Sequence, residues 1–470
     1  MKERRKTGGK RPAHLDKSGR KRPVHAELST KKPKTETVKP KVERGAVNDD
    51  LLRALKAWFA GRHGGEQSAD DALSTTGKAG RWELKGQLDR VFRHYARLAW
   101  LIRRQDVEPN GEWLWAAASV VLDRAPLEEV ARRIAVTAAD ISKFAGKLGR
   151  MGNEGIAHEA MPNPVRAEVP EKIHGILSEA YGAELTAELK ALNHPAPLDI
   201  RVNTLKGEVA DVMAALNVGD TQVAPTPYAP LGLRAKGKPD LAVTEAFTTG
   251  QFDMQDEGSQ IVAALADARP GQQVLDFCAG AGGKSLALAA AMANKGHLVA
   301  ADTSAKRLAR AKLRLKRAGV ENAERILLTG TDADPYFKRK AAQFDRVLVD
   351  APCSGTGAWR RHPEAKWAAE IDLERLTALQ NAILARAAKM LKRGGRLTYA
   401  TCSILPAENQ QRVTAFLKAH PGFKQVPVAE VWAQVIPNAP YPGKETETLQ
   451  LTPFRHGTDG FFAAVFERTA

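Results

Sequence analysis

The 470-residue sequence contains three cysteines, and each of them lies in a stretch rich in small residues. Cys278 opens the run Cys-Ala-Gly-Ala-Gly-Gly-Lys-Ser, Cys353 follows a proline in Pro-Cys-Ser-Gly-Thr-Gly, and Cys402 stands in Ala-Thr-Cys-Ser. The three are far apart and lack C-x-x-C spacing, so they indicate neither a zinc site nor a disulfide framework. A lone cysteine is usually a small core hydrophobe, but its thiolate is a strong nucleophile. Which description applies depends on the elements that position the three thiols.

The first positioning element is the segment 274–285. Apolar residues lead into Asp276, glycines follow, and an alanine-rich run over 286–293 is typical of a helix. This pattern predicts a buried strand, a tight turn and a helix N-terminus, where backbone N–H groups meet a ligand. A Walker loop would need glycine at Cys278, and a dinucleotide fingerprint would need glycine at Ser285. We therefore favour a ligand with an amino acid end and a ribose but no phosphate, S-adenosylmethionine, over a purely structural glycine turn.

Further strands follow at the rhythm of βα units. The predicted strands 297–302, 325–332 and 345–350 each end in an aspartate, as 274–276 does. Acids at the carboxyl ends of neighbouring parallel strands face one crevice, where ligands bind in open sheets. Cys353 follows the strand 345–350, and Cys402 lies at the end of the next predicted strand, 395–403. We therefore expect all three thiols to surround one pocket.

Two thiols beside a methyl donor suit methylation at a pyrimidine carbon. Cytosine C5 is a poor nucleophile, so a thiolate adds to C6 and C5 then attacks the sulfonium methyl group. Asp350 is placed to stabilise charge that develops on the ring near N3, and it could also contact the cofactor. A base then removes the C5 proton, and elimination frees the thiol. Spacing alone does not tell which thiol is the nucleophile and which is the helper.

The charge of the chain points to a polyanionic partner. Its formal net charge is +17 and its isoelectric point is about 9.7, which favour nucleic acid first and an anionic membrane surface second. Sixteen basic and five acidic residues between Met1 and Arg44 supply +11 of this charge. The tail 1–48 is predicted to be disordered, as an electrostatic tether to RNA or a solubilising segment. With no signal peptide and no long apolar run, we expect a cytoplasmic protein without a membrane contact or a metal.

Three further regions follow this tail. Residues 49–160 have helical spacing and are predicted to form an all-α domain; residues 161–245 mix short helices with strands, and residues 246–470 carry the motifs described above. In the helical region one apolar stripe should form the core: Leu88, Val91, Phe92, Tyr95 and Leu98. The arginines on its other faces are expected either to touch phosphate or to be merely solvated: Arg90, Arg93, Arg97, Arg103 and Arg104.

Six stretches carry a resemblance to a known family: DFCAGAGGKS (276–285), DAPCSGTGAWRRHPEAKW (350–367), GGRLTYATCSILPAENQ (394–410), IRVNTLK (200–206), GQFDMQDEGSQ (250–260) and RHGTDGFFAAVF (455–466). From about residue 160 to 470 the chain resembles the Nop/Sun family of RNA cytosine-C5 methyltransferases, most closely its bacterial ribosomal RNA branch (Sun/Fmu-like). The resemblance implies a class I Rossmann-like methyltransferase sheet, an α/β fold, preceded by a small α+β RNA-binding module (161–245). The helical region (49–160) distantly resembles the NusB-like RNA-binding domain of that branch.

The resemblance also implies roles for individual residues. Cys402 is implied to be the nucleophile, and Cys353 is implied to assist release of the product. Contacts with S-adenosylmethionine are implied for Cys278, Ala279, Gly280, Ala281, Gly282, Gly283, Lys284, Asp302, Asp332 and Asp350. The family's first motif usually reads Cys-Ala-Ala-Pro-Gly-Gly-Lys. Here Gly280 and Ala281 replace Ala-Pro, which loosens the loop slightly but keeps every glycine and the lysine.

The sequence thus predicts transfer of a methyl group from S-adenosylmethionine to C5 of a cytidine in RNA, most consistent with ribosomal RNA. Two rivals stay open: a DNA or tRNA cytosine-C5 methyltransferase, with Cys353 as nucleophile in the DNA enzyme, and a non-catalytic RNA-binding factor of ribosome assembly. Beside the thiol loop, a basic and aromatic group is expected either to stack on and bind RNA or to pack as an ordinary loop: Trp359, Arg360, Arg361, His362 and Trp367.

Overall fold

The computed structural model of the chain describes residues 49–61, 78–104, 106–141, 156, 158–237, 239–329, 335–368 and 370–470. These residues belong to one structural unit, 44–470. The tail predicted over 1–48 and Asp332 lie outside the described residues. The domain boundaries predicted at residues 160 and 245 therefore stay predictions, although the elements change in kind near both.

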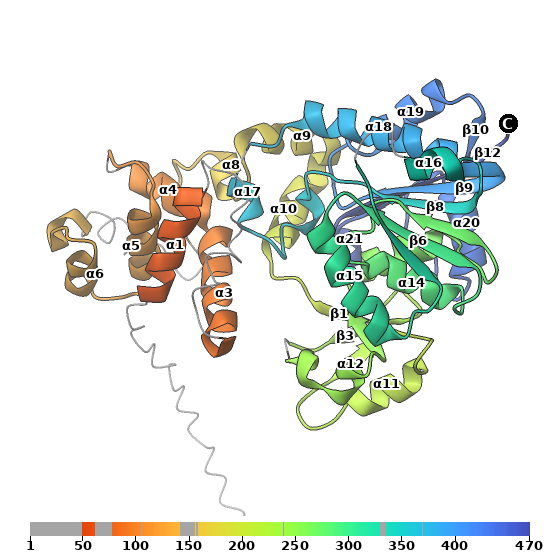
Figure 1. The fold of residues 1–470 in the computed structure, drawn as a ribbon. Coiled ribbons are helices and arrows are strands. Elements are labelled where there is room, and N and C mark those ends of the chain that lie inside the picture. The colour runs from red at the N-terminus through yellow and green to blue at the C-terminus, as the bar shows by residue number, and fades with distance from the viewer. Residues whose placement is uncertain are drawn as a thin grey trace, which may run out of the picture. The chain divides into compact units, whose positions relative to one another are not determined.

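The first described region is a group of helices (Figure 1). They pack around large aromatic side chains. Its predicted stripe is confirmed, since Leu88, Val91, Phe92, Tyr95 and Leu98 are all buried. Asn110 caps one helix by accepting hydrogen bonds from the backbone N–H groups of Glu112 and Trp113. The helices are α1 (Asp49–Gly61), α3 (Lys78–Arg93), α4 (Tyr95–Arg103), α5 (Gly111–Val121) and α6 (Leu127–Arg133).

A short helical segment and a small sheet come next. Within the small sheet the strand order is β2-β3-β1-β4 and every pairing is antiparallel. Its apolar face packs on two helices because Ile200, Val202 and Leu233 are fully buried there. The helices before it are α8 (Asn163–Arg166), α9 (Glu171–Tyr181), η2 (Gly182–Glu184) and α10 (Leu185–Asn193). The elements of the module are β1 (Leu198–Val202), α11 (Val209–Leu216), β2 (Val223–Pro225), β3 (Gly232–Ala235), η3 (Leu241–Val243), α12 (Glu245–Thr248) and β4 (Phe252–Met254).

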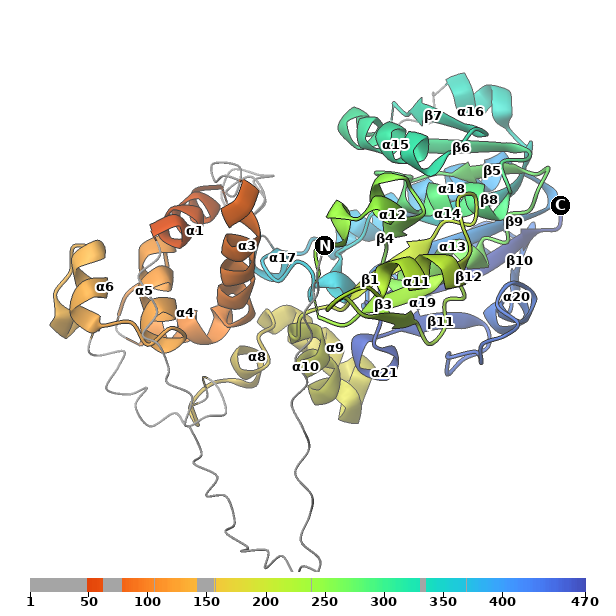
Figure 2. The ribbon, with the colours of Figure 1, turned by 90° about the horizontal axis from the view of Figure 1, so that it is seen from below.

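The largest element is a mixed sheet with the order β10-β12-β9-β8-β5-β6-β7, and β11 also pairs with β12 (Figure 2). The five strands from β9 to β7 are parallel, whereas β12 runs antiparallel to β9 and β10. Its strands are β5 (Gln273–Asp276), β6 (His297–Asp302), β7 (Ala323–Leu327), β8 (Phe344–Asp350), β9 (Leu391–Thr401), β10 (Phe423–Val426), β11 (Thr448–Leu451) and β12 (Phe461–Arg468). The predicted class I methyltransferase architecture is confirmed.

Helices cover both faces of this sheet because consecutive strand residues point to opposite sides. Leu275 packs in the layer of α18 and α19, while Val274 packs in the layer of α13, α14 and α20. The helices are α13 (Glu257–Leu265), α14 (Gly283–Ala291), α15 (Ala305–Ala318), α16 (Pro335–Lys340), η4 (Thr356–Ala358), α17 (Ala365–Ala368), α18 (Leu373–Met390), α19 (Gln410–Ala419), α20 (Val428–Val435) and α21 (Pro453–His456). None of the helices in the described ranges is long and apolar enough to cross a membrane.

Candidate active site

A pocket of about 660 Å³ opens at the carboxyl ends of β5, β6, β8 and β9. The strand order reverses between β5 and β8, which is where ligands bind in open parallel sheets. Most of the residues predicted from the sequence line this one pocket: Cys278, Ala279, Gly280, Ala281, Gly283, Lys284, Asp302, Asp350, Cys353 and Cys402. Of the other two, Gly282 lies within the same loop without lining the pocket, and Asp332 is outside the described residues.

The glycine loop has a backbone that a side chain would disturb. Gly280 and Gly282 have φ of 57° and 81°, in the left-handed region that glycine adopts without strain. A Cβ atom on Gly282 would also lie 3.1 Å from the Cβ of Ala311 on α15. Asp302 holds the loop from the next strand, since its Oδ2 accepts a hydrogen bond from the N–H of Gly280 at 2.8 Å. These contacts fix the conformation of the loop.

Asp276, at the end of β5, lies under this loop and is fully buried. Burial raises its pKa to about 7; the Ser285 hydroxyl, which donates to Oδ2 at 2.6 Å, works against the rise, and the negative charge of Asp350 adds to it. Within the described part of the chain, no group donates a hydrogen bond to its other oxygen, Oδ1, although that atom is buried. An unpaired acceptor at the base of a pocket fits a ligand that brings a donor, as the amino group of S-adenosylmethionine would.

We expect the Asp276→Asn variant to change how stability depends on pH. A carboxyl whose pKa is raised in the folded state stabilises the protein fully below pH 4, and this contribution is lost as the pH rises through about 7. The stability of Asp276→Asn relative to the unmodified protein should therefore rise by about 1.4 kcal/mol per pH unit over this window. Urea unfolding at pH 5, 6 and 7 measures it. A difference that stays constant with pH would show that Asp276 titrates normally.

The two thiols predicted to act together lie side by side. The Sγ atoms of Cys353 and Cys402 are 3.4 Å apart, and both cysteines are free. The hydrogen bond with Cys402 raises the pKa of Cys353 well above its usual value, and burial raises it further. Either sulfur can donate its S–H to the other, so one thiol is in position to donate a hydrogen bond to a thiolate at its neighbour.

A lysine and an aspartate complete the polar side of the pocket. Lys284 Nζ lies 2.6 Å from Asp350 Oδ2, and its side chain is 10% exposed. Burial acts to lower the pKa of Lys284, but the negative charge of Asp350, with a contribution from Cys402, outweighs it and the pKa is raised. The lysine is therefore charged, next to the thiols and to the end of β8.

Support for the thiol loop comes from residues that the sequence interpretation did not single out. Glu408 is fully buried, and its carboxylate accepts hydrogen bonds from the N–H of Ser354 at 2.8 Å and from the amide of Gln380 at 3.0 Å. Gln380 also donates to the carbonyl of Pro352 at 3.0 Å. The signal for Glu408 was present, because this residue lies in the stretch 394–410 that carries the resemblance.

Gly357 joins the two thiol loops and leaves no room for a side chain. Its N–H donates to the carbonyl of Cys402 at 2.9 Å, and a Cβ atom here would lie 2.1 Å from the carbonyl oxygen of Gly460. We expect Gly357→Ala to lower the unfolding free energy by about 1–3 kcal/mol and to displace the Cys402 loop, so that activity falls as well. Gly175→Ala is the matched control, because its Cβ would meet open space on α9 and should be neutral or stabilising. Equal melting temperatures for the two variants would contradict this account.

In this region the structure decides between two open alternatives and corrects one expectation. Trp359 and Trp367 are 1% and 8% exposed and pack in the hydrophobic cores, so they cannot stack on RNA bases; the alternative of ordinary loop packing holds for them. The strand predicted over 325–332 ends at Leu327 as β7, and Asp332 lies outside the described residues. Aspartates do end β5, β6 and β8, as predicted.

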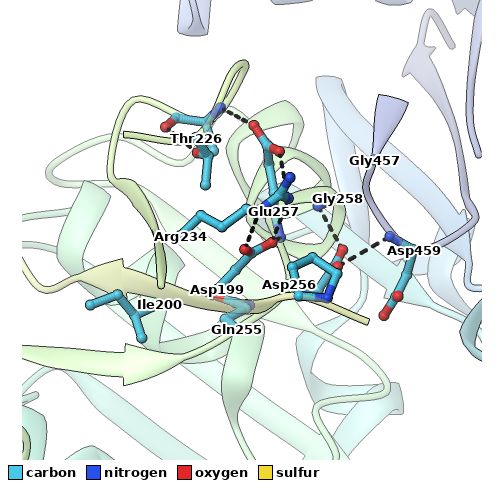
Figure 3. Close-up of polar contacts among 12 residues, drawn as sticks. Asp199, Ile200, Thr226, Arg234, Gln255, Asp256, Glu257, Gly258, Gly457 and Asp459 are labelled. Carbon is cyan, nitrogen blue, oxygen red and sulfur yellow. Dashed lines mark hydrogen bonds and ion pairs between the residues drawn. The ribbon is translucent and has the colours of Figure 1, made fainter. Parts of the chain in front are cut away.

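The far wall of the pocket is the junction with the small sheet (Figure 3). Arg234 of β3 donates to both carboxylate oxygens of Asp199 at 2.7 and 2.9 Å and reaches Glu257 at 3.3 Å. Asp256, just before α13, accepts hydrogen bonds from the N–H groups of Gly258 and Asp459. Asp199, Asp256 and Asp459 also line the pocket, which was not predicted. The small sheet is thereby fixed against the pocket.

Comparison with known proteins agrees with this architecture. The family model described as "16S rRNA methyltransferase RsmB/F" matches residues 263–467, and the model described as "Methyltr_RsmF/B-like, ferredoxin-like domain" matches residues 169–242. The latter range contains most of the small antiparallel sheet. The solved structure of PH0851 is similar with a TM-score of 0.73 and 26% identity, over 91% of this chain and 100% of that chain.

Two curated relatives carry the comparison further. The probable ribosomal RNA small subunit methyltransferase B of Bacillus subtilis (strain 168) is 33% identical over 361 residues, 72% of this chain and 78% of the relative. The ribosomal RNA small subunit methyltransferase B of Yersinia pseudotuberculosis serotype O:1b (strain IP 31758) is 36% identical over 289 residues, 61% of this chain and 63% of the relative. The chain therefore belongs to the RsmB/F family of ribosomal RNA methyltransferases, enzymes that take the methyl group from S-adenosylmethionine.

Proposed function

We propose that the protein methylates C5 of a cytidine in small-subunit ribosomal RNA through a covalent bond between Cys402 and C6. The observation that carries this proposal is the pair of free thiols, 3.4 Å apart, at the ends of adjacent parallel strands and in one pocket with the glycine loop. A methyltransferase that acts on oxygen or on an exocyclic nitrogen has no need of a nucleophilic thiol. Methyl transfer to C5 needs one, because the ring must first be activated at C6.

The nucleophile is Cys402. The S–H of Cys353 can donate to its sulfur, and the ammonium group of Lys284 lies close enough to interact with its charge. Both contacts stabilise a thiolate at Cys402. When Cys402 has added to C6, negative charge moves onto the ring, and the Lys284–Asp350 pair at the end of β8 is positioned to stabilise it near N3.

The loops of β5 and β6 would hold the cofactor. Asp276 would accept a hydrogen bond from its amino group, the glycine loop from Cys278 to Lys284 would donate backbone N–H groups, and Asp302 would accept from its ribose hydroxyl groups. Asp302 Oδ2 accepts a hydrogen bond from Gly280 and retains a second lone pair for a hydroxyl group, whereas Oδ1 is already paired with the N–H of Ser304 and with Arg307. Bound S-adenosylmethionine supplies the electrophilic methyl group.

The remaining steps restore the enzyme. After the methyl group is on C5, a base removes the C5 proton, the electron pair of that C–H bond re-forms the C5–C6 double bond, and the bond from C6 to the Cys402 sulfur breaks. Cys353 assists this elimination from its position 3.4 Å away. The products are the 5-methylcytidine, the demethylated cofactor and a free thiolate.

Ribosomal RNA is the proposed substrate because both curated relatives carry that substrate in their names. The net charge of +17 suits a phosphate backbone, and the module over 161–245 is proposed to hold the RNA beside the pocket. The target base has to leave its stack to reach thiols at the bottom of a pocket. We propose the cytoplasm as the site of action.

The test is nucleoside mass spectrometry of in vitro-transcribed small-subunit ribosomal RNA after incubation with the protein and S-adenosylmethionine. We expect 5-methylcytidine, and no product on a DNA strand of the same sequence. Product on DNA alone would support the DNA enzyme, and product on transfer RNA alone would change the substrate class. RNA binding without a methylated nucleoside on naked RNA or on small ribosomal subunits would support a non-catalytic assembly factor.

A further inference from the structure

A second cavity, of about 740 Å³, lies between the helical region and the helices that precede the small sheet. Its walls come from α3 and α4 on one side and from α8, α9 and α10 on the other. The cavity is lined mainly by polar and cationic side chains, and its basic members are Arg93, His94, Arg97, Arg166, His174, Lys190 and His194. Among the described residues, no aspartate or glutamate lines it.

The arginines of this cavity are held in place without losing their charge. Arg93, 8% exposed, donates to the carbonyl oxygens of Asn193 at 2.9 Å and Arg360 at 2.6 Å. Arg166 donates to the carbonyl of Glu159, and Arg97 donates to the carbonyl of Arg166. A carbonyl oxygen is neutral, so these contacts orient the guanidinium groups but leave a positive field. This differs from the usual arginine, which is neutralised by a carboxylate.

Carboxylates outside the lining of the cavity offset part of this field. Glu168 is 1% exposed, and its Oε1 lies 3.5 Å from Arg97 Nε. The charges of Asp89 and Glu364 act on Arg93, although burial still lowers the pKa of Arg93. The pKa of His94 reports the same field: burial lowers it to about 4, and the positive charges of Arg97, Arg90, Arg93 and Lys366 act in the same direction.

We propose that this cavity binds phosphodiester groups of the RNA substrate, next to the nucleotide that enters the active site. The inference rests on the proposed function for the identity of the nucleic acid. Guanidinium groups held in place by neutral carbonyl oxygens present positive charge to a phosphate, and the cavity volume is within the range of ligand sites. Exposed Arg166 and Lys190 form its entrance, and buried Arg93 forms its wall.

One hydrogen bond and one peptide bond connect this cavity to the catalytic pocket. Arg93 donates to the carbonyl of Arg360, and the next residue, Arg361, lines the catalytic pocket. The segment Arg360–Arg361 thus lines the catalytic pocket and also holds Arg93 in the second cavity. RNA whose base is turned into the catalytic pocket has its flanking phosphates exposed, and the second cavity offers them a site.

The experiment measures the salt dependence of RNA affinity for the full chain. Each phosphate contact contributes roughly 0.7 to 0.9 to the slope of log K against log[salt]. The double variant Arg166→Ala/Lys190→Ala should reduce this slope by about 1.4 to 1.8 on in vitro-transcribed small-subunit ribosomal RNA. Both side chains are exposed, so the variant should keep its melting temperature. The matched control is Arg132→Ala/Lys418→Ala, which removes the same charges at exposed positions outside the cavity and should change the slope much less.

Steady-state kinetics separates this proposal from the proposed function. If the cavity holds flanking phosphates, the cavity variant should raise KM for RNA at least tenfold and change kcat little. A slope and a KM equal to those of the control variant would overturn the phosphate site while leaving the methylation intact. If the unmodified protein forms no 5-methylcytidine, the proposed function fails, and the slope still decides whether the cavity binds phosphate. The cavity variant could also bind RNA as the control variant does but lose binding to polyglutamate. That result would assign the cavity to an acidic protein and overturn the proposal.

Discussion

Replacing Cys402 with alanine should abolish methyl transfer, whereas replacing Cys353 with alanine should leave the protein covalently attached to its RNA. Without the Cys402 thiolate, C6 is not attacked and C5 stays unreactive, so the rate should fall at least about 1,000-fold. Without Cys353, addition and methyl transfer proceed but the elimination loses its helper, 3.4 Å from the bond that must break. A denaturing gel with radiolabelled RNA shows the covalent complex, and nucleoside mass spectrometry shows the product.

The third thiol supplies the matched control. Cys278 lines the same pocket but lies on the cofactor loop, and burial raises its pKa well above the usual value. Cys278→Ala should therefore weaken cofactor binding at most, and no covalent RNA complex should accumulate. The opposite pattern, with Cys353→Ala inactive and Cys402→Ala trapped on RNA, would exchange the two roles and favour the mechanism of the DNA rival.

Replacing Asp350 with asparagine is the second change with a large expected effect. The substitution keeps the shape but leaves the buried ammonium group of Lys284 without its carboxylate, 2.6 Å away in the native protein. An uncompensated buried charge costs about 3 kcal/mol. The pKa of Lys284 should fall, since the raising effect of Asp350 is gone and burial remains. We expect the rate of methyl transfer to decrease about 100-fold or more at saturating cofactor, because a Lys284 that has lost its proton no longer stabilises negative charge on the ring.

The other end of the same strand provides the control for this variant. Asp345, the second residue of β8, pairs with Lys392, and the two side chains are 18% and 49% exposed. A partly exposed pair contributes only about 0–1 kcal/mol. An asparagine also keeps an oxygen for the N–H of Gln273, so Asp345→Asn should keep its activity and nearly all of its stability. Single-turnover kinetics and thermal unfolding of both variants make the comparison. An equal loss of rate in both variants would mean that Asp350 contributes to the structure of β8 and that its charge is not what catalysis needs.

Local patterns were enough to predict most of the fold. The alternation of apolar residues around Val274 and Leu275, the glycines after Asp276 and the repeated strand-ending acids each depend on residues a few positions apart. The helical stripe from Leu88 to Leu98 has the same local character. The strand over 325–332 was placed too far along the chain, because its apolar residues continue past the point where pairing with β6 stops at Leu327. Pairing partners are distant in sequence, so a strand end is not encoded locally.

By itself, the sequence determined the kind of site: three thiols in loops of small residues, a glycine turn after an acid, and acids that follow strands. Only the tertiary structure decided which of these groups meet. Three contacts show this: the 3.4 Å contact of Cys353 with Cys402, the Lys284–Asp350 pair and the hydrogen bond from Gln380 to Glu408. They join residues that are 28 to 66 positions apart in the sequence. Burial also determined the role of the tryptophans beside the thiol loop. The linear motif suggests that Trp359 stacks on RNA, but in the fold this residue is 1% exposed. Contacts and burial depend on how the sheet brings its strand ends together, and no local pattern contains that information.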